Sequence, residues 1–216
     1  MPTGQRVAGR SWAGFLADAR DGLRFARQDF FVSRLVVVQA LASLSVGATS
    51  ALLVVLAREH YRLPPEGFSS FILAIGVGAL LGPFLLAALT RDVRHPRWLF
   101  GPYVIRGLGD VLLAATRFVP LAWLLLFIYG LNTSSGMITY QTWLQREVPD
   151  EVRGRVFTWL DVVWNVMKIA SLGLGAWLAE GAGVAVVYYA GGTMLFVSGL
   201  TGLLMLRSYT IEPATG

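Results

Sequence analysis

The sequence lacks cysteine and contains few charged residues. Of its 216 residues, 14% are charged and 55% are hydrophobic, whereas a soluble domain carries about 25% charged residues. The absence of cysteine excludes disulfides, catalytic thiolates and cysteine-ligated metal sites. The formal charge of +5 does not indicate a nucleic-acid partner, because the basic residues lie at the ends of apolar stretches, where they set membrane orientation.

Six long apolar stretches separated by short polar loops dominate the chain. A bilayer core about 30 Å thick is crossed by roughly 20 apolar residues in a helix, and backbone exposed to lipid must form its own hydrogen bonds. The sequence therefore predicts an all-α integral membrane protein with the lipid bilayer as its solvent. The expected spans are 33–57, 67–90, 98–116, 120–144, 156–179 and 183–206.

A different pattern precedes the first span. Trp12, Phe15, Ala19 and Leu23 recur at three- and four-residue spacing, which is typical of an amphipathic helix lying on the membrane surface. The sequence thus divides into a cytoplasmic lead-in at 1–32, a six-helix bundle at 33–210 and a short cytoplasmic tail at 211–216.

Arginine is distributed unequally between the two sides of these spans. The N-terminal segment, the loops after the second and fourth spans, and Arg207 hold most of the basic residues, while the opposite side holds Arg58, Arg62 and Arg117. Basic residues accumulate on the cytoplasmic side, so we expect both termini in the cytoplasm.

No combination of residues favours an enzyme. His60 and His95 fall in loops on opposite sides of the membrane, so they cannot share a metal ion, and no metal or cofactor is expected. Ser134 and Ser135 have no histidine within any span to act as a base. No phosphate-binding loop of the form G-x-x-x-x-G-K-[ST] occurs, so the chain does not encode an ATP-driven pump.

Two charged residues share one face of the third span. Arg106 and Asp110 are four residues apart, so an intramembrane ion pair is expected. Charges inside a bilayer are costly and commonly functional. The pair is interpreted either as part of a proton or substrate relay, or as a self-neutralising pair that stabilises the span against its neighbours.

The fifth span carries a polar stripe of Asp161, Asn165 and Lys168, spaced by four and three residues. Lys168, the only lysine, lies too deep for its ammonium to reach the interface easily. We expect the stripe to face a water-filled cavity of a transport pathway, although Asp161 alone is also compatible with a position near the interface.

The fourth span is unusually polar, with Asn132, Gly136 and Tyr140 on one face and Gln141 beside them. One interpretation is a hydrogen-bonding wall of a substrate or proton pathway that includes Asn132, Tyr140 and Gln141. The other is ordinary hydrogen bonding between helices, worth under about 2 kcal/mol per contact.

Small residues predict close packing in the second span. Gly78 and Gly82 form a small-xxx-small pair that lets two backbones approach. We interpret the pair as ordinary packing rather than as a specific dimerisation motif.

The fourth loop, LQREVPDEVRGRVF at 144–157, resembles the LQ-x-x-VPDE-x-RGRVF signature before the eleventh helix of bacterial major facilitator superfamily exporters. The nearest branch holds the enterobactin exporters and macrolide efflux proteins. DGLRF at 21–25 resembles that branch's linker before the seventh helix, and IGVGALLG at 75–82 resembles its eighth helix. The resemblance covers roughly residues 12–206.

The loops also suggest gating roles. Pro149 ends one helix, and Asp150 and Glu151 then begin the next, where the helix dipole favours anions. Arg153 and Arg155 can pair with acids or with helix carboxyl ends, either as a cytoplasmic latch or as a simple orientation signal. The second loop, with Asp92 and Arg94, resembles the superfamily's Asp/Arg loop but lacks its leading glycine.

By this resemblance the chain corresponds to the C-terminal half of a proton-coupled exporter of a small lipophilic drug or siderophore in the bacterial inner membrane. Spans one, two, four and five then line the cavity. Alternating access needs a second six-helix half, supplied by another copy or by a separate N-terminal half. The alternative is a non-transporting scaffold or an inactive remnant.

Overall fold

The computed structural model describes residues 24, 28–90, 92–93 and 95–207. Apart from short turns, these residues are helical. The long helices are α2 (Phe30–Ala51), α4 (Pro65–Leu89), α5 (Pro96–Ala115), α6 (Val119–Glu147), α7 (Asp150–Ala182) and α8 (Val184–Met205). The short α3 (Leu53–Val55) and the π-helical η1 (Leu56–His60) follow α2. The predicted surface helix lies almost wholly outside the described residues, as does the tail at 211–216.

Five helices are long and apolar enough to cross a membrane: α2, α4, α6, α7 and α8. The sixth expected span, α5, is less apolar because Arg106 and Asp110 lie inside it, and its crossing stays a prediction. Two boundaries differ from expectation. The α2 helix begins at Phe30, inside the predicted lead-in, because the Asp29 carboxylate accepts a hydrogen bond from the Val32 amide at 2.7 Å. The α7 helix begins several residues early, at Asp150.

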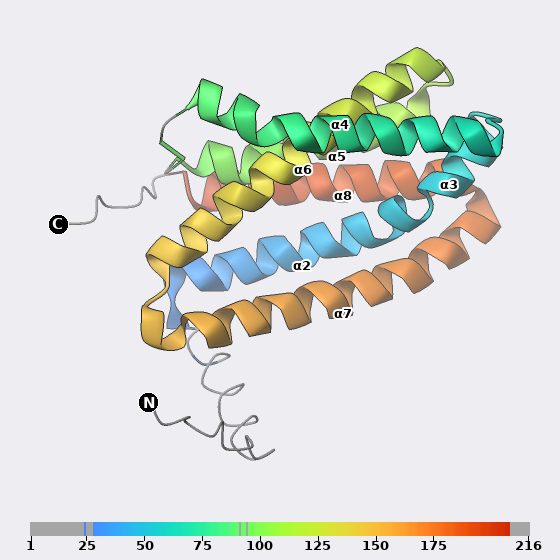
Figure 1. Ribbon diagram of the computed structural model, residues 1–216. Helices are drawn as coiled ribbons and strands as arrows, with labels where there is room; N and C mark the ends of the chain where they lie inside the picture. Colours follow the sequence, from blue (N-terminus) through green and yellow to red (C-terminus); the bar gives the residue numbers. More distant parts are fainter. Residues whose placement is uncertain (1–23, 25–27, 91, 94, 208–216) are drawn as a thin grey trace, which may run out of the picture.

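The long helices pack as three pairs (Figure 1): α4 runs parallel to α6, α2 runs parallel to α7, and α5 runs antiparallel to α8. The α5–α8 pair joins the other two, because α5 also packs against α6 and α8 against α2. Helices α4 and α7 thus lie at opposite edges of the bundle. We call the side formed by α4, α6, α2 and α7, in front of α5 and α8 in Figure 1, the front face.

Small residues bring each pair into backbone contact. Gly78 of α4 lies against the Phe127 carbonyl of α6, and Gly107 of α5 lies against Gly192 of α8. Neither position has room for a Cβ atom. The α4 glycines therefore serve packing within the chain, in agreement with the interpretation of Gly78 and Gly82 as ordinary packing residues.

Candidate functional site

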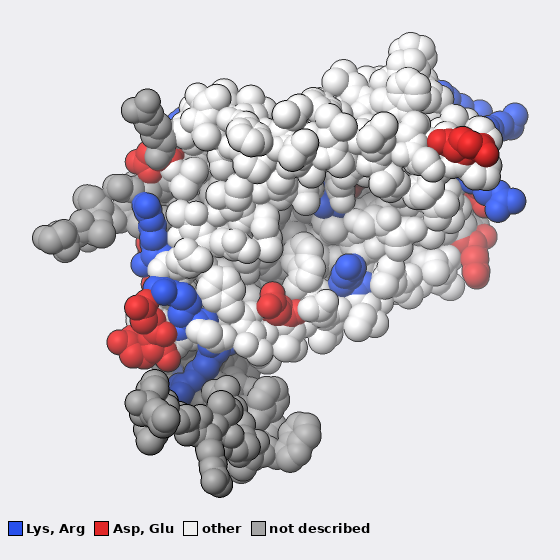
Figure 2. Space-filling view, viewed as in Figure 1, with Lys and Arg blue, Asp and Glu red and all other residues white. Residues whose placement is uncertain are grey.

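Charged residues gather at the two ends of the bundle, leaving a broad and mostly uncharged band between them (Figure 2). Isolated acidic and basic groups interrupt this band on the front face over α7. The charged residues of α7 between Arg155 and Glu180 are Asp161 and Lys168, the charged members of the predicted polar stripe.

The structure exposes all three residues of the polar stripe. Asn165 donates from Nδ2 to the Asp161 main-chain carbonyl at 2.8 Å, so part of its hydrogen-bonding capacity is used within α7. Lys168 forms no hydrogen bond or ion pair with any residue that the structure describes. The buried side of α7 instead carries Val156, Leu160 and Ser171. An unpaired ammonium therefore projects from the exposed side of a long apolar helix.

The stripe lies beside a second group of polar residues, which we call the inner cluster: Gln39 of α2, Tyr103 of α5 and Tyr140 of α6. The Tyr103 hydroxyl donates to Gln39 Oε1 at 2.5 Å. The Tyr140 hydroxyl is also within hydrogen-bonding reach of Gln39 and close enough to Asp161 for an electrostatic interaction. Tyr140 and Asp161, predicted separately, therefore lie near each other.

Sequence reasoning missed Gln39 and Tyr103. Gln39 is 6% exposed and is flanked by apolar residues on both sides in the sequence, from Val36 to Ala42. A lone amide in such a run was a usable signal, because a polar group at that depth needs a partner. Tyr103 gave no comparable signal, since tyrosine is common in membrane helices.

The remaining α6 candidates lie elsewhere. Asn132 donates to the Ile128 carbonyl at 2.9 Å and lines a cavity of about 270 Å³ between α4, α5 and α6. Gln141 is exposed. The hydroxyls of Ser135 and Thr139 donate to carbonyls four residues earlier in α6, at 2.7 and 3.1 Å. Much of the span's polarity is thus satisfied within its own helix, and Asn132 does not join Tyr140.

Arg106 and Asp110 do not form the expected direct ion pair: no guanidinium nitrogen of Arg106 lies within 4.0 Å of an Asp110 carboxylate oxygen. Arg106 Nη2 instead donates to Ser50 Oγ at 3.2 Å, and its guanidinium lies 4.1 Å from the centroid of the Tyr129 ring. Because helix packing offers Arg106 these partners on α2 and α6, the guanidinium extends away from Asp110. Both residues line a common cavity.

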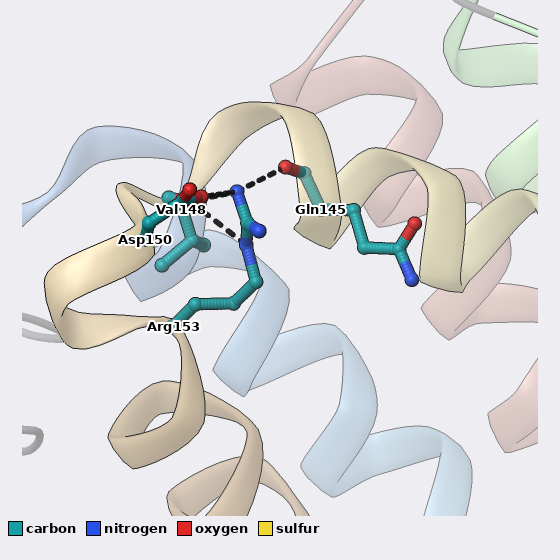
Figure 3. Close-up of polar contacts among 4 residues, drawn as sticks. All are labelled: Gln145, Val148, Asp150 and Arg153. Atoms are coloured by element: carbon teal, nitrogen blue, oxygen red, sulfur yellow. Dashed lines mark hydrogen bonds and ion pairs between the residues drawn. The ribbon is translucent and has the colours of Figure 1, made fainter. Parts of the chain in front are cut away.

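The loop before α7 is held by one arginine (Figure 3). Arg153 donates from Nη2 to the carbonyls of Gln145 and Val148, at 2.6 and 3.0 Å, and forms an ion pair with Asp150. Asp150 and Glu151 occupy the first turn of α7, as expected. The arginine thus binds both an acid and a helix carboxyl end.

The other predicted loop residues are less defined. The Asp92 amide donates to Thr90 Oγ1 at 3.0 Å, and the Thr90 hydroxyl donates to the Asp92 carbonyl at 2.8 Å. Asp92 and Arg155 also take part in further interactions. Arg94 lies outside the described residues. Trp143 Nε1 donates to the Val93 carbonyl at 2.7 Å, so this loop is tied to α6.

Both histidine rings form hydrogen bonds with backbone atoms. His60 Nε2 lies 2.8 Å from the Thr116 carbonyl, and His95 Nδ1 accepts from the Arg97 amide at 3.2 Å. Within the described part of the chain, no three histidine or acidic residues are grouped as metal ligands. The site's chemistry is that of hydrogen bonding and charge.

The family model of the Major Facilitator Superfamily matches residues 9–215. Comparison with curated proteins finds no match. Comparison with solved structures finds none either.

Proposed function

We propose that this chain, which belongs to the Major Facilitator Superfamily of membrane transporters, forms one six-helix half of an exporter. It corresponds to the C-terminal half and acts with a second six-helix half by alternating access. The cargo is a small lipophilic compound, a drug or a siderophore, and protons drive its export. The enterobactin exporter and macrolide efflux branch is the one that its loop sequence resembles.

The observation that carries this proposal is the unpaired Lys168. An ammonium facing lipid at this depth is strongly unfavourable, and Lys168 has no partner among the described residues. A water-filled cavity on the front face removes that cost, because the ammonium is then solvated. A transport pathway provides such a cavity, whereas a scaffold has no need of one.

The helix arrangement supports the same assignment. The α4–α6 and α2–α7 pairs flank the α5–α8 pair, so the front face is formed by the four helices expected to line the cavity. The polar stripe and Tyr140 supply donors and acceptors there, and the mostly uncharged surface around them (Figure 2) suits a lipophilic cargo. A second bundle facing this side completes the enclosure.

The loop at Arg153 supports a cytoplasmic gate. Its contacts to the α6 carboxyl end and to Asp150 join two helices of the front face at one end. Breaking and remaking these contacts permits α6 and α7 to change their separation. In this assignment the loop lies on the cytoplasmic side of the bacterial inner membrane, as do both termini.

Transport in proteoliposomes tests the proposal. The protein, together with its partner half if that half is a separate chain, is given an imposed proton gradient and either a lipophilic dye or a catecholate siderophore. We expect proton-driven movement of one compound, loss of movement in Lys168→Leu and retention in Lys168→Arg. The matched control Glu180→Gln, at the far end of α7, is expected to leave transport unchanged.

Two results would overturn the proposal. If the wild-type protein moves neither compound under any gradient, the non-transporting scaffold or remnant becomes the better account. If Lys168→Leu transports as well as the wild type and unfolds less readily, Lys168 does not serve the pathway.

A further inference from the structure

A cavity of about 180 Å³ lies between the helices, apart from the polar stripe, and opens to the surface beside the exposed residues Ser50 and Ile72. It is bounded by residues of α2, α4, α5, α6 and α8, among them Ser50, Ile72, Arg106, Asp110, Tyr129 and Tyr188. Most of its wall is apolar, and its charged residues are Arg106 and Asp110. A cavity that brings both together within a membrane protein calls for a physical explanation.

Asp110 is the most unusual group in this wall. It is 4% exposed, and its Oδ2 atom has no hydrogen-bond partner. Arg106 is not within ion-pair distance. An ionised carboxylate buried in this way is very unfavourable unless it is paired and hydrogen-bonded. The Thr49 side chain lies beside the carboxylate, so in the conformation seen here the missing partner of the Oδ2 atom is a proton or a donor inside the cavity.

Arg106 is held close by but directed elsewhere. Its guanidinium contacts Ser50 and the Tyr129 ring, while its Nε atom is buried without an acceptor. The residue thus has an unused donor one helical turn from the unused acceptor of Asp110. Ser50 is exposed, so Arg106 lies between Asp110 and the surface of the bundle.

Besides Arg106, the titratable groups near Asp110 among the described residues are tyrosines. Tyr129 and Tyr188 line the cavity from α6 and α8, and Tyr61 lies nearby, before α4. The Tyr188 and Tyr61 hydroxyls donate to the carbonyls of Thr49 and Leu113, so their protons are engaged. The lining residues from α2, α3 and α4 are not titratable: Thr49, Ser50, Leu53, Ile72 and Ile75.

The volume of the cavity indicates whether it holds the transported compound or only water that carries protons. Drug-sized ligands occupy pockets of roughly 300–1,000 Å³, which exceeds the 180 Å³ available. A water molecule needs about 30 Å³ and two to four polar partners. The space therefore fits a few water molecules beside Asp110 and Arg106, and water conducts protons.

We propose that Asp110 is a proton-binding site of the transporter, reached through cavity water past Ser50 and Arg106. A proton from this water binds the Asp110 carboxylate, giving a neutral acid with Arg106 on Ser50 and Tyr129. When the proton returns to water, the carboxylate attracts Arg106, which leaves Ser50 and pairs with Asp110. Protonation thus changes which helices Arg106 joins. The coupling role rests on the proposed function.

Infrared difference spectroscopy measures this protonation without requiring transport. Purified protein in liposomes is titrated, and the carbonyl stretch of protonated carboxylic acids is followed. We expect a band that is lost in the isosteric Asp110→Asn variant and retained in the control Glu180→Gln. In Arg106→Gln the band is expected to persist to higher pH, because the cation that favours the ionised carboxylate is gone. A band unchanged by Asp110→Asn would overturn the proposal.

The absence of cysteine allows a clean test of water access. Ser50→Cys and Leu108→Cys each place one thiol in the protein, the first beside the cavity and the second on an exposed apolar part of α5 outside it. A small water-soluble thiol reagent is expected to modify Cys at position 50 and to leave position 108 unmodified in liposomes. An unreactive thiol at position 50 would overturn the proposed route.

The two proposals fail separately. If the wild type transports nothing but shows the Asp110 band, the protonation site stands and its coupling role falls with the proposed function. If Asp110→Asn transports with an unchanged dependence on the proton gradient, the proposed exporter function is retained and the proposal that Asp110 is its proton-binding site is wrong. Asp110→Asn is first checked for a wild-type elution volume and helix content, and Asp110→Glu, which keeps the acid, is expected to restore the band.

Discussion

Substitution of Arg153 should weaken the junction between α6 and α7 by a predictable amount. The guanidinium binds the Gln145 carbonyl in the last turn of α6 and the Val148 carbonyl just beyond it. These carbonyls have no partner further along the helix. Because Arg153→Gln removes the charge and most of the donors, both carbonyls lose their charged partner.

The magnitude follows from the burial of each contact. Hydrogen bonds to charged groups contribute about 1.5–3 kcal/mol each when well formed. The Val148 bonds are partly buried and the Gln145 bond is exposed, so the low end applies, and we expect a total loss of about 2 kcal/mol. The ion pair adds under about 1 kcal/mol, because the Asp150 side chain is 81% exposed.

Denaturant unfolding in detergent, followed by tryptophan fluorescence, measures these differences, since Trp143 and Trp159 lie in the two helices. Asp150→Asn should cost much less than Arg153→Gln, and only the Asp150 contribution should shrink in high salt. Arg146→Gln, a nearby exposed arginine without a described partner, is the matched control. A loss below about 0.5 kcal/mol in Arg153→Gln would refute the reasoning, as would an equal loss in Asp150→Asn.

Three further predictions use the same unfolding measurement. Gly130→Ala should destabilise the α4–α6 pair by about 1–3 kcal/mol, because the added Cβ atom collides with the backbone of α4. In the control Gly76→Ala, the added Cβ atom contacts no other residue, so the change should be neutral or stabilising. Equal effects of the two substitutions would contradict the packing. Ser171→Ala should cost about 1–2 kcal/mol, because Ser171 Oγ accepts from the Ala48 amide at 2.8 Å, and a neutral result would remove that contact's importance. Burial raises the pKa of Tyr61 from 10.0 to about 12, so the folded state favours the neutral phenol. The contribution of Tyr61 to the free energy of unfolding is therefore fully present below pH 10 and is lost as the pH rises toward 12. The stability difference between wild type and Tyr61→Phe should therefore shrink over that range, and a constant difference would contradict it.

The sequence was a good guide to helices because lipid constrains each span locally. The predicted span 67–90 matches α4 (Pro65–Leu89), and 183–206 matches α8 (Val184–Met205). The prediction of one continuous span at 33–57 missed the interruption at Leu52 and the π-helical turn after it. Hydropathy carries no information on that break, since the residues on both sides of it are equally apolar.

Candidate residues were predicted less well than helices because their partners come from other helices. The spacing of Arg106 and Asp110 predicted a pair within α5, but Ser50 and Tyr129 offered the guanidinium alternatives that helical periodicity cannot reveal. Gln39 and Tyr103, 64 residues apart, pair for the same reason. In contrast, the Arg153 contacts were foreseeable, because all of its partners lie within eight residues.

The pairing of α2 with the last two helices has a consequence for biosynthesis. Ser45 binds the Gly191 carbonyl, 146 residues away, and Ser198 binds the Val38 carbonyl, 160 residues away. Helix α2 leaves the ribosome before α7 and α8, so its polar groups must remain in the translocon or lipid until those two helices have been synthesised. Nascent chains that stop before α8 therefore present an unfinished helix interface, and membrane quality-control proteases should recognise them.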